Sequence, residues 1–163
     1  MIYLDNGATS FHKPESVHRA VQHSLRTCAN SGRGGYGASM AAAREVFACR
    51  QTASELFDCD PEQVVFTSNC THGLNLAIHS LVKPGATVAI TGFEHNAVLR
   101  PLVDRNCRLQ IGGRKLFDWE DTLESFEKAL RGADAAVFTH VSNVFGYILP
   151  VYEMAALCRQ YSI

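Results

Sequence analysis

Short apolar segments alternate with amphipathic segments along most of this 163-residue chain, and this alternation limits the folds open to it. The apolar segments are nearly continuous, whereas a strand with one face exposed to solvent would alternate apolar and polar residues. They cover residues 64–67, 87–91, 107–111 and 135–140, with a further short candidate at 2–4. The sequence therefore predicts an α/β fold, with a largely parallel sheet and helices on both of its faces.

The segments between the predicted strands carry the signals of helices. Proline suits the first position of a helix, so Pro14 and Pro150 are expected to open the first and last helices. Ser39 and Asp118 can cap two others through their side-chain oxygens. In the helix after Ser39, helical spacing predicts an inner face of Ala43, Val46, Phe47, Ala53 and Phe57. Two more helices are expected, one from Leu74 to the stop signal Lys83-Pro84-Gly85 and one over residues 97–104.

The composition is that of an ordinary soluble domain, with 47% apolar and 19% charged residues. A formal net charge of −1 gives no electrostatic reason to expect nucleic acid or an anionic membrane as a partner. No apolar run is long enough to span a membrane and the first residues do not resemble a signal peptide, so a cytoplasmic protein is expected. The six cysteines are scattered without a C-x-x-C pair, which favours free thiols over disulfides or a zinc site.

A small polar segment, Thr67-Ser68-Asn69-Cys70-Thr71-His72-Gly73, stands between a predicted strand and a predicted helix. The first amides of a helix have no partners inside the helix, and the helix dipole makes this end positive. A phosphate group could accept these amides together with a Ser68 or Thr71 hydroxyl, while Gly73 allows close approach. Capping of the helix by Ser68, Asn69 or Thr71 would explain the same residues without a ligand. Both interpretations stay open at this point.

Two further polar loops, Glu94-His95-Asn96 and residues 142–146, follow predicted strands. His95 could stack on a flat ring or transfer protons near neutral pH, or it could be an ordinary surface histidine. Asn143 could donate its side-chain amide to a ligand oxygen, or its loop could simply satisfy its own backbone. Loops after parallel strands gather at one edge of the sheet, so a ligand site shared with the 67–73 segment is expected there.

The letters G-x-G-x-x-G of dinucleotide-binding loops occur at residues 32–37. That fingerprint requires a strand directly before it, and residues 27–31 do not have the character of a strand. We therefore favour a loop that becomes ordered over a ligand or a partner subunit over a dinucleotide-binding domain.

Four segments together resemble the class V aminotransferase family of pyridoxal-phosphate enzymes, in particular its cysteine desulfurases and selenocysteine lyases. In the family's order they are Tyr3-Leu4-Asp5-Asn6-Gly7-Ala8-Thr9-Ser10, the 67–72 segment with Asn75-Leu76-Ala77, Glu94-His95-Asn96-Ala97-Val98 and Ser142-Asn143-Val144-Phe145-Gly146. The resemblance covers nearly the whole chain and implies the type I fold of these enzymes. Residues 1–163 would be an N-terminal segment and the first part of the large, cofactor-binding domain, as a portion of a longer protein.

The resemblance also implies roles for individual residues. Cys70 and Thr71 would hold the phosphate of pyridoxal 5'-phosphate through their backbone amides and the Thr71 hydroxyl. His95 would stack on the pyridine ring and could assist proton transfer. Asn143 would donate a hydrogen bond to the phenolic oxygen of the cofactor.

On the substrate side, the resemblance places Gly7 and Ala8, and it implies a homodimer acting on a small amino acid such as L-cysteine. Gly7 stands where the family usually has alanine, and His72 stands where desulfurases often have glutamate. Residues 30–37 would lie near the active-site entrance and the dimer interface.

The function implied by the resemblance is cysteine desulfuration, in which sulfur leaves L-cysteine and L-alanine remains. In the family, the Schiff-base lysine, the aspartate that pairs with the pyridine nitrogen and the nucleophilic cysteine all lie in later segments. None of the lysines here (Lys13, Lys83, Lys115 and Lys128) follows a predicted strand beside the site, so this chain alone is expected to be inactive. The alternatives are a non-catalytic fragment that acts only in association, and another class V activity such as transamination or selenocysteine lysis.

Overall fold

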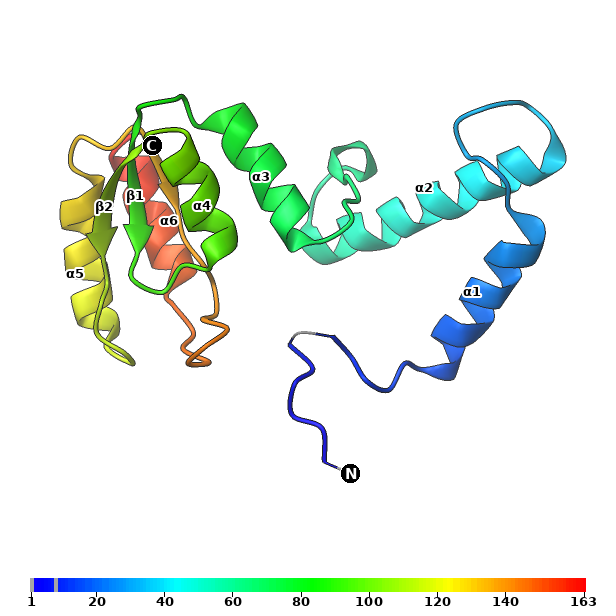
Figure 1. The fold of residues 1–163 in the computed structure, drawn as a ribbon, viewed down its shortest axis with the longest axis horizontal. Helices are drawn as coiled ribbons and strands as arrows, with labels where there is room; N and C mark the ends of the chain where they lie inside the picture. The colour runs from blue at the N-terminus through cyan, green and yellow to red at the C-terminus, as the bar shows by residue number, and fades with distance from the viewer. Residues whose placement is uncertain (1, 8) are drawn as a thin grey trace. The chain divides into compact units, whose positions relative to one another are not determined.

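The computed structural model describes residues 2–7 and 9–163, which divide into two compact units. The first unit ends at Phe66 and the second runs from Thr67 to Ile163. The chain can be followed by colour from the N-terminus to the C-terminus in Figure 1. The second unit contains the sheet and the predicted cofactor-binding residues Cys70, Thr71, His95 and Asn143.

The first unit is helical. Its elements are α1 (Glu15–Thr27), α2 (Gly37–Phe57) and the short 3-10 helix η1 (Pro61–Gln63). Pro14 precedes α1, as predicted. Ser39 does not cap α2, because the helix already begins at Gly37. The Ser39 hydroxyl instead donates to the carbonyl oxygens of Asn30 (2.7 Å) and Arg33 (3.2 Å), so it fastens the preceding loop onto the first turn of the helix.

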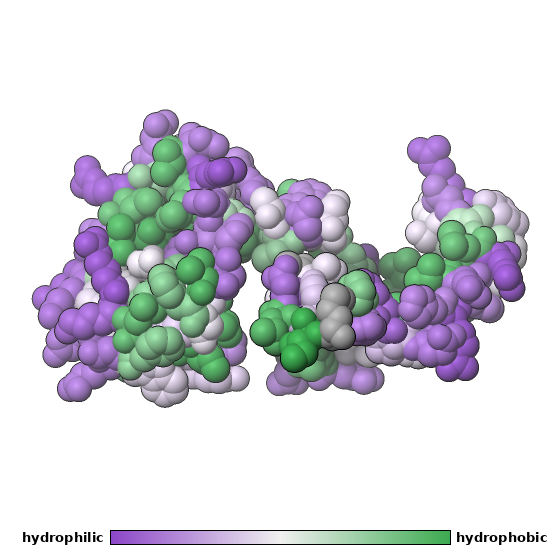
Figure 2. Space-filling view, turned by 60° about the horizontal axis from the view of Figure 1, so that its bottom comes forward, coloured by the Kyte–Doolittle hydropathy of each residue, from purple (hydrophilic) through white to green (hydrophobic). Residues whose placement is uncertain are grey.

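The predicted inner face of α2 is wrong. Val46, Phe47 and Phe57 are 39%, 48% and 72% exposed, and the buried residues of the helix are Ser39, Ala42 and Ser54. An apolar stripe is buried only where another element packs on it. Within the described residues of this unit, α1 and η1 are the elements that pack on α2, and they leave much of the stripe uncovered. Apolar surface of this kind is visible in green in Figure 2.

The sheet of the second unit is parallel, with the order β2-β1-β3. Its strands are β1 (Thr87–Thr91), β2 (Arg108–Gly112) and β3 (Ala135–Val137). β1 matches its predicted range, β2 is displaced by one residue, and β3 is the first half of the predicted strand. In the central strand, Val88 is in register with Leu109 on one side and Ala135 on the other.

Two predicted strands are absent. Residues 2–4 and 64–67 have no strand structure, and Val65 and Phe66 are 71% and 56% exposed. A strand is stable only when its backbone groups pair with a neighbour. Among the described residues none pairs with either segment, which explains why apolar composition alone misled the prediction.

Helices cover both faces of the sheet, as predicted (Figure 1). One face carries α4 (Asn96–Asp104), with α3 (Cys70–Leu81) packed beside it, and the other carries α5 (Trp119–Leu130) and α6 (Val151–Gln160). Successive residues of β1 point to opposite faces. Val88 and Ile90 therefore join the core formed with α3 and α4, whereas Ala89 joins the core formed with α5 and α6.

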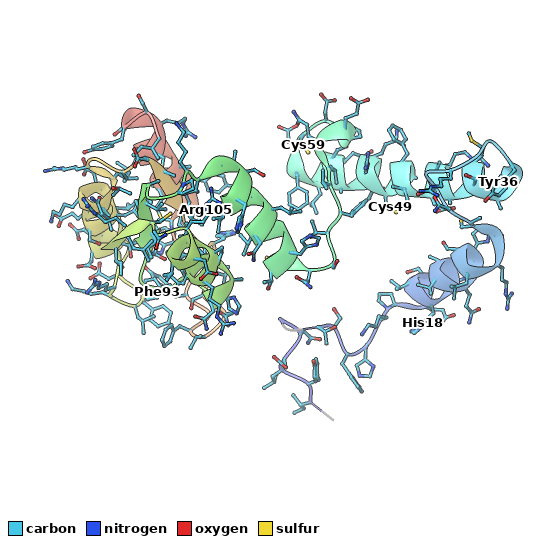
Figure 3. The ribbon with its side chains drawn as sticks, turned by 45° about the horizontal axis from the view of Figure 1, so that its top comes forward. His18, Tyr36, Cys49, Cys59, Phe93 and Arg105 are labelled. Carbon is cyan, nitrogen blue, oxygen red and sulfur yellow. The ribbon has the colours of Figure 1, made fainter. Side chains whose placement is uncertain are left out.

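Two local contacts set the ends of these helices. Asp118 caps α5 as predicted, and its Oδ1 accepts the Asp121 amide at 2.9 Å. Arg105, which follows α4, donates through Nε and Nη2 to the Val82 carbonyl oxygen at 3.0 and 2.6 Å. Arg105 is labelled in Figure 3. Because Val82 directly follows α3, this bond ties the C-terminal ends of α3 and α4 together.

Candidate functional site

The first turn of α3 leaves two backbone amides without a partner. Asn69 is the N-cap, and its Oδ1 accepts the His72 amide at 2.9 Å. The Asn69 carbonyl oxygen accepts the Gly73 amide at 3.1 Å. For the amides of Cys70 and Thr71 no acceptor exists among the described residues. Capping and anion binding are therefore compatible here, because the cap uses one amide and leaves two donors at the positive end of the helix dipole.

A hollow of about 430 Å³ lies between the N-terminal part of α3 and the length of α4. Its lining residues are Thr71, Asn75, His95, Asn96, Ala97, Arg100, Pro101 and Asp104. Thr71 and His95, which the sequence assigned to one site, thus border the same space. Asn75 donates from Nδ2 to the Thr71 carbonyl oxygen at 2.8 Å and so braces the turn that carries Thr71.

His95 has a fixed ring orientation. It is the N-cap of α4, and its Nδ1 accepts the Ala97 amide at 3.0 Å. A ring nitrogen that accepts a hydrogen bond carries no proton, so the neutral ring bears its proton on Nε2. The ring is exposed, and this leaves Nε2 able to donate to a ligand.

Glu94 connects the ends of two neighbouring strands. Its Oε1 accepts the Thr91 hydroxyl at 2.5 Å and the Thr139 amide at 2.9 Å. Burial raises the pKa of the Glu94 carboxyl above its ordinary value, and the hydrogen bonds from Thr91 and Thr139 only partly oppose this shift. Sequence reasoning did not single out Glu94. The signal that could have found it is a carboxylate directly before His95, at the end of a buried strand.

Asn143 lies in a tight loop that follows β3. Val141 forms an antiparallel bridge with Ile148, and the Ser142 amide donates to the Tyr147 carbonyl oxygen at 2.9 Å. Ser142 is buried, whereas Asn143 is exposed. Asn143 is not among the residues that line the hollow. The structure therefore brings Thr71 and His95 to one space and places Asn143 on the loop that Glu94 fastens to the end of β1.

Gly7 and Ala8, the predicted substrate-side residues, precede the second unit. Gly7 belongs to the first unit, where a Cβ added to it would meet no atom within 4 Å. Ala8 lies outside the described residues. Cys70 is exposed with a free thiol, so its side chain is not engaged in a disulfide.

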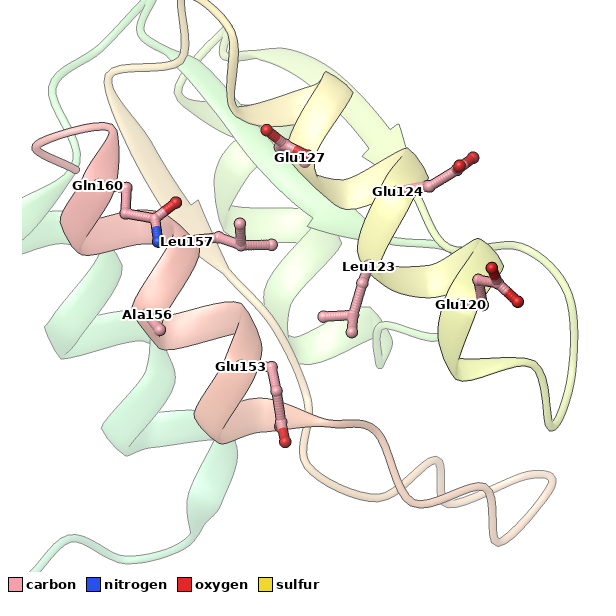
Figure 4. A pocket seen from close by; sticks show the side chains of 8 residues that line it. All are labelled: Glu120, Leu123, Glu124, Glu127, Glu153, Ala156, Leu157 and Gln160. Carbon is pink, nitrogen blue, oxygen red and sulfur yellow. The ribbon is translucent and has the colours of Figure 1, made fainter.

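A separate groove of about 380 Å³ lies between α5 and α6 (Figure 4). Leu123, Ala156 and Leu157 contribute apolar surface to it, and carboxylates of four glutamates stand around it. None of the predicted site residues lines this groove. Over the part of the chain that the structure covers, no cluster of three or more His, Cys, Asp or Glu side chains is arranged to hold a metal ion. Within those same residues, no helix has the length and apolar character needed to cross a membrane.

Comparisons with known proteins identify relatives of this chain. A family model described as aminotransferase class-V matches residues 2–163. The cysteine desulfurase IscS of Vibrio vulnificus is 31% identical over 175 residues, which cover 99% of this chain and 42% of that protein. A probable cysteine desulfurase of Pyrococcus abyssi is 27% identical over 98% of this chain and 41% of its own length. The chain thus spans about two fifths of the length of these relatives.

Solved structures give the same picture of the fold. The apo structure of a cysteine desulfurase from Thermococcus onnurineus NA1 matches with a TM-score of 0.88 and 28% identity, over 99% of this chain and 42% of that one. A mutant of C-DES with glycine covalently linked to its PLP cofactor matches with a TM-score of 0.77 and 19% identity, over 90% of this chain and 40% of that one. The three-stranded parallel sheet and its flanking helices therefore correspond to the large-domain fold of PLP-dependent enzymes.

Proposed function

This chain belongs to the aminotransferase class-V family, and from this premise we propose that it carries part of a pyridoxal 5'-phosphate site of the cysteine desulfurase type. The complete protein would be a homodimer that removes sulfur from L-cysteine and leaves L-alanine, with residues 1–163 as the N-terminal segment and first part of its large domain. One observation carries the proposal. The two unpaired amides of Cys70 and Thr71 stand at the end of α3 that borders the hollow shared with His95.

The phosphate is the part of the cofactor that these residues fit best. A doubly charged group gains from two free amide donors and from the positive end of a helix dipole. Thr71 lines the same hollow, and its hydroxyl would add a third donor. The turn itself has little room at Gly73, because a Cβ there would lie only 3.3 Å from the Thr67 hydroxyl oxygen.

The other two residues would contact the ring of the cofactor. His95, held through Nδ1, would stack its imidazole on the ring and keep a proton on Nε2 for transfer. Asn143 would donate its side-chain amide to the phenolic oxygen. Bound pyridoxal phosphate supplies an electron sink for bonds broken at the α-carbon of an amino acid.

Removal of a single amide tests this proposal. In Cys70→Pro the backbone donor is lost, while proline remains well suited to the first position of α3. Cys70→Ala is the matched control, because it removes the same thiol but keeps the amide. A hydrogen bond to a charged group contributes about 1.5–3 kcal/mol, so Cys70→Pro should weaken binding of pyridoxal 5'-phosphate by at least about tenfold. Cys70→Ala should stay within about twofold of the unmodified chain.

The measurement is a titration of the 163-residue chain with pyridoxal 5'-phosphate, followed by absorbance and by fluorescence. Pyridoxal without its phosphate should bind far more weakly, and inorganic phosphate should compete. Equal affinities for the proline and alanine variants would contradict the phosphate role of this amide, and so would equal binding of pyridoxal and its phosphate.

A further inference from the structure

Two strand ends at one edge of the sheet lead into the loops that carry His95 and Asn143. β1 ends at Thr91 and β3 ends at Val137. Between them lies Glu94, whose Oε1 accepts the Thr91 hydroxyl at 2.5 Å and the Thr139 amide at 2.9 Å. A single oxygen atom therefore joins the end of β1 to the backbone that continues from β3.

An apolar contact holds the same two loops together. Phe93, labelled in Figure 3, is 8% exposed and meets Tyr147 edge-on with ring centroids 5.2 Å apart. It also meets Phe145 edge-on at 6.4 Å. Phe93 and Glu94 are adjacent in sequence. One short segment therefore contacts the Asn143 loop through the aromatic ring of Phe93 and through the carboxylate of Glu94.

We propose that Glu94 is a positioning residue, whose Oε1 holds the Asn143 loop against the strand end that presents His95. This inference rests on the proposed function, because it takes His95 and Asn143 as the groups that contact the cofactor ring. Groups that must contact one ligand from different loops need a support that fixes their separation to a fraction of an ångström. Glu94 provides this support without touching the ligand itself.

Substitutions can separate the acceptor oxygen from the rest of the side chain. Glu94→Gln keeps an oxygen that can accept both hydrogen bonds, whereas Glu94→Ala leaves the Thr139 amide and the Thr91 hydroxyl without this acceptor. Leu130→Ala is the matched control for general destabilisation. Leu130 is 1% exposed, and it ends α5, the helix that leads to the opposite, amino-terminal end of β3.

Two measurements on the 163-residue chain test the inference. The first is hydrogen exchange of the Thr139 amide by NMR. For each variant, the exchange rate of Thr139 is compared with the rate expected from that variant's free energy of unfolding in the absence of denaturant. The second is the dissociation constant for pyridoxal 5'-phosphate, with the His95 ring and Asn143 side-chain amide signals followed during the titration. Glu94→Ala should speed Thr139 exchange and weaken binding, each by about tenfold, as expected when a part-buried amide loses its acceptor. Glu94→Gln should restore both to within about threefold, and Leu130→Ala should lower the melting temperature without selective change at Thr139, His95 or Asn143.

The results also separate this inference from the proposed function. If the unmodified chain binds no pyridoxal phosphate, the proposed function fails, and the exchange data still decide whether Glu94 holds the loop. Thr139 exchange in Glu94→Ala no faster than in Leu130→Ala would overturn the inference. Binding by Glu94→Ala as tight as by Glu94→Gln would overturn it as well.

Discussion

At the scale of single residues, the polar segment before α3 serves two purposes that looked like alternatives in the sequence. Asn69 caps the helix, and the amides of Cys70 and Thr71 stay free. The sequence indicated Ser68, Asn69 and Thr71 as possible caps, but it did not indicate which of these side chains would cap the helix. That choice depends on backbone angles, since Asn69 is fully extended at φ −168° and ψ 171° and so aims its side chain at the His72 amide.

Glu94 should make stability depend on pH. Burial raises the pKa of this carboxyl in the folded state above its ordinary value of 4.5, so the folded protein keeps the proton in a pH interval where the unfolded chain has lost it. In that interval the free energy of unfolding falls as the pH rises, because the folded state binds more protons than the unfolded state. The contribution is fully present below the unfolded pKa and is lost as the pH rises through the folded pKa.

The check is urea unfolding between pH 4 and pH 7 for the unmodified chain and Glu94→Gln. Glutamine cannot ionise, so the variant should gain stability relative to the unmodified chain as the pH increases. A constant stability difference would show that hydrogen bonding to the ionised carboxylate offsets its burial, and a difference that moves in the other direction would show that hydrogen bonding outweighs burial.

At the scale of elements, prediction succeeded where local signals and burial agreed. α5 begins after its predicted cap Asp118 and buries Thr122, Phe126, Ala129 and Leu130, which lie on one face of a helix. β1 was predicted to the residue because its run is apolar on both faces. The α2 stripe and residues 64–67 were misjudged, because whether they are buried depends on neighbouring elements that the local pattern does not specify.

The packing of α5 on β2 depends on a glycine. A Cβ at Gly112 would lie 2.5 Å from the Phe126 Cα and 2.6 Å from the Ser125 carbonyl oxygen. These are backbone atoms, which no side-chain rotation can move away, so Gly112→Ala should push α5 and β2 apart. Overpacking of this kind lowers the free energy of unfolding by about 1–3 kcal/mol. Because the contacts here are with backbone atoms, we expect the loss for Gly112→Ala to be at or above the upper end of this range.

Gly35→Ala is the control, because a Cβ there would meet no atom within 4 Å. Denaturant unfolding of both variants measures the difference. A Gly112→Ala chain as stable as Gly35→Ala would mean that α5 does not approach β2 as closely as described.

At the scale of the whole molecule, the described lysines bear on catalysis. None of the four lines the hollow between α3 and α4. Lys115 pairs with Asp121 at 2.9 Å and Lys128 with Glu124 at 3.5 Å, which holds both amines to α5. Lys83 follows the far end of α3, and Lys13 belongs to the first unit. A lysine that reacts with a carbonyl cofactor must lie beside it with a desolvated amine, and the described residues of the second unit offer none in that position.

We therefore expect the 163-residue chain alone to bind pyridoxal 5'-phosphate without turning over L-cysteine. Sulfide and alanine are measured after adding both compounds together with dithiothreitol, which reduces the transferred sulfur to sulfide, and a mixture of pyridoxal phosphate, cysteine and dithiothreitol without protein is the control. The chain should release neither product above that control, and borohydride should not fix one equivalent of the cofactor to a single lysine. Alanine and sulfide formed in equal amounts, well beyond one equivalent of protein, would show that the chain holds a complete catalytic site. Cofactor binding without turnover would instead agree with a chain whose described residues hold the phosphate and include no reacting amine.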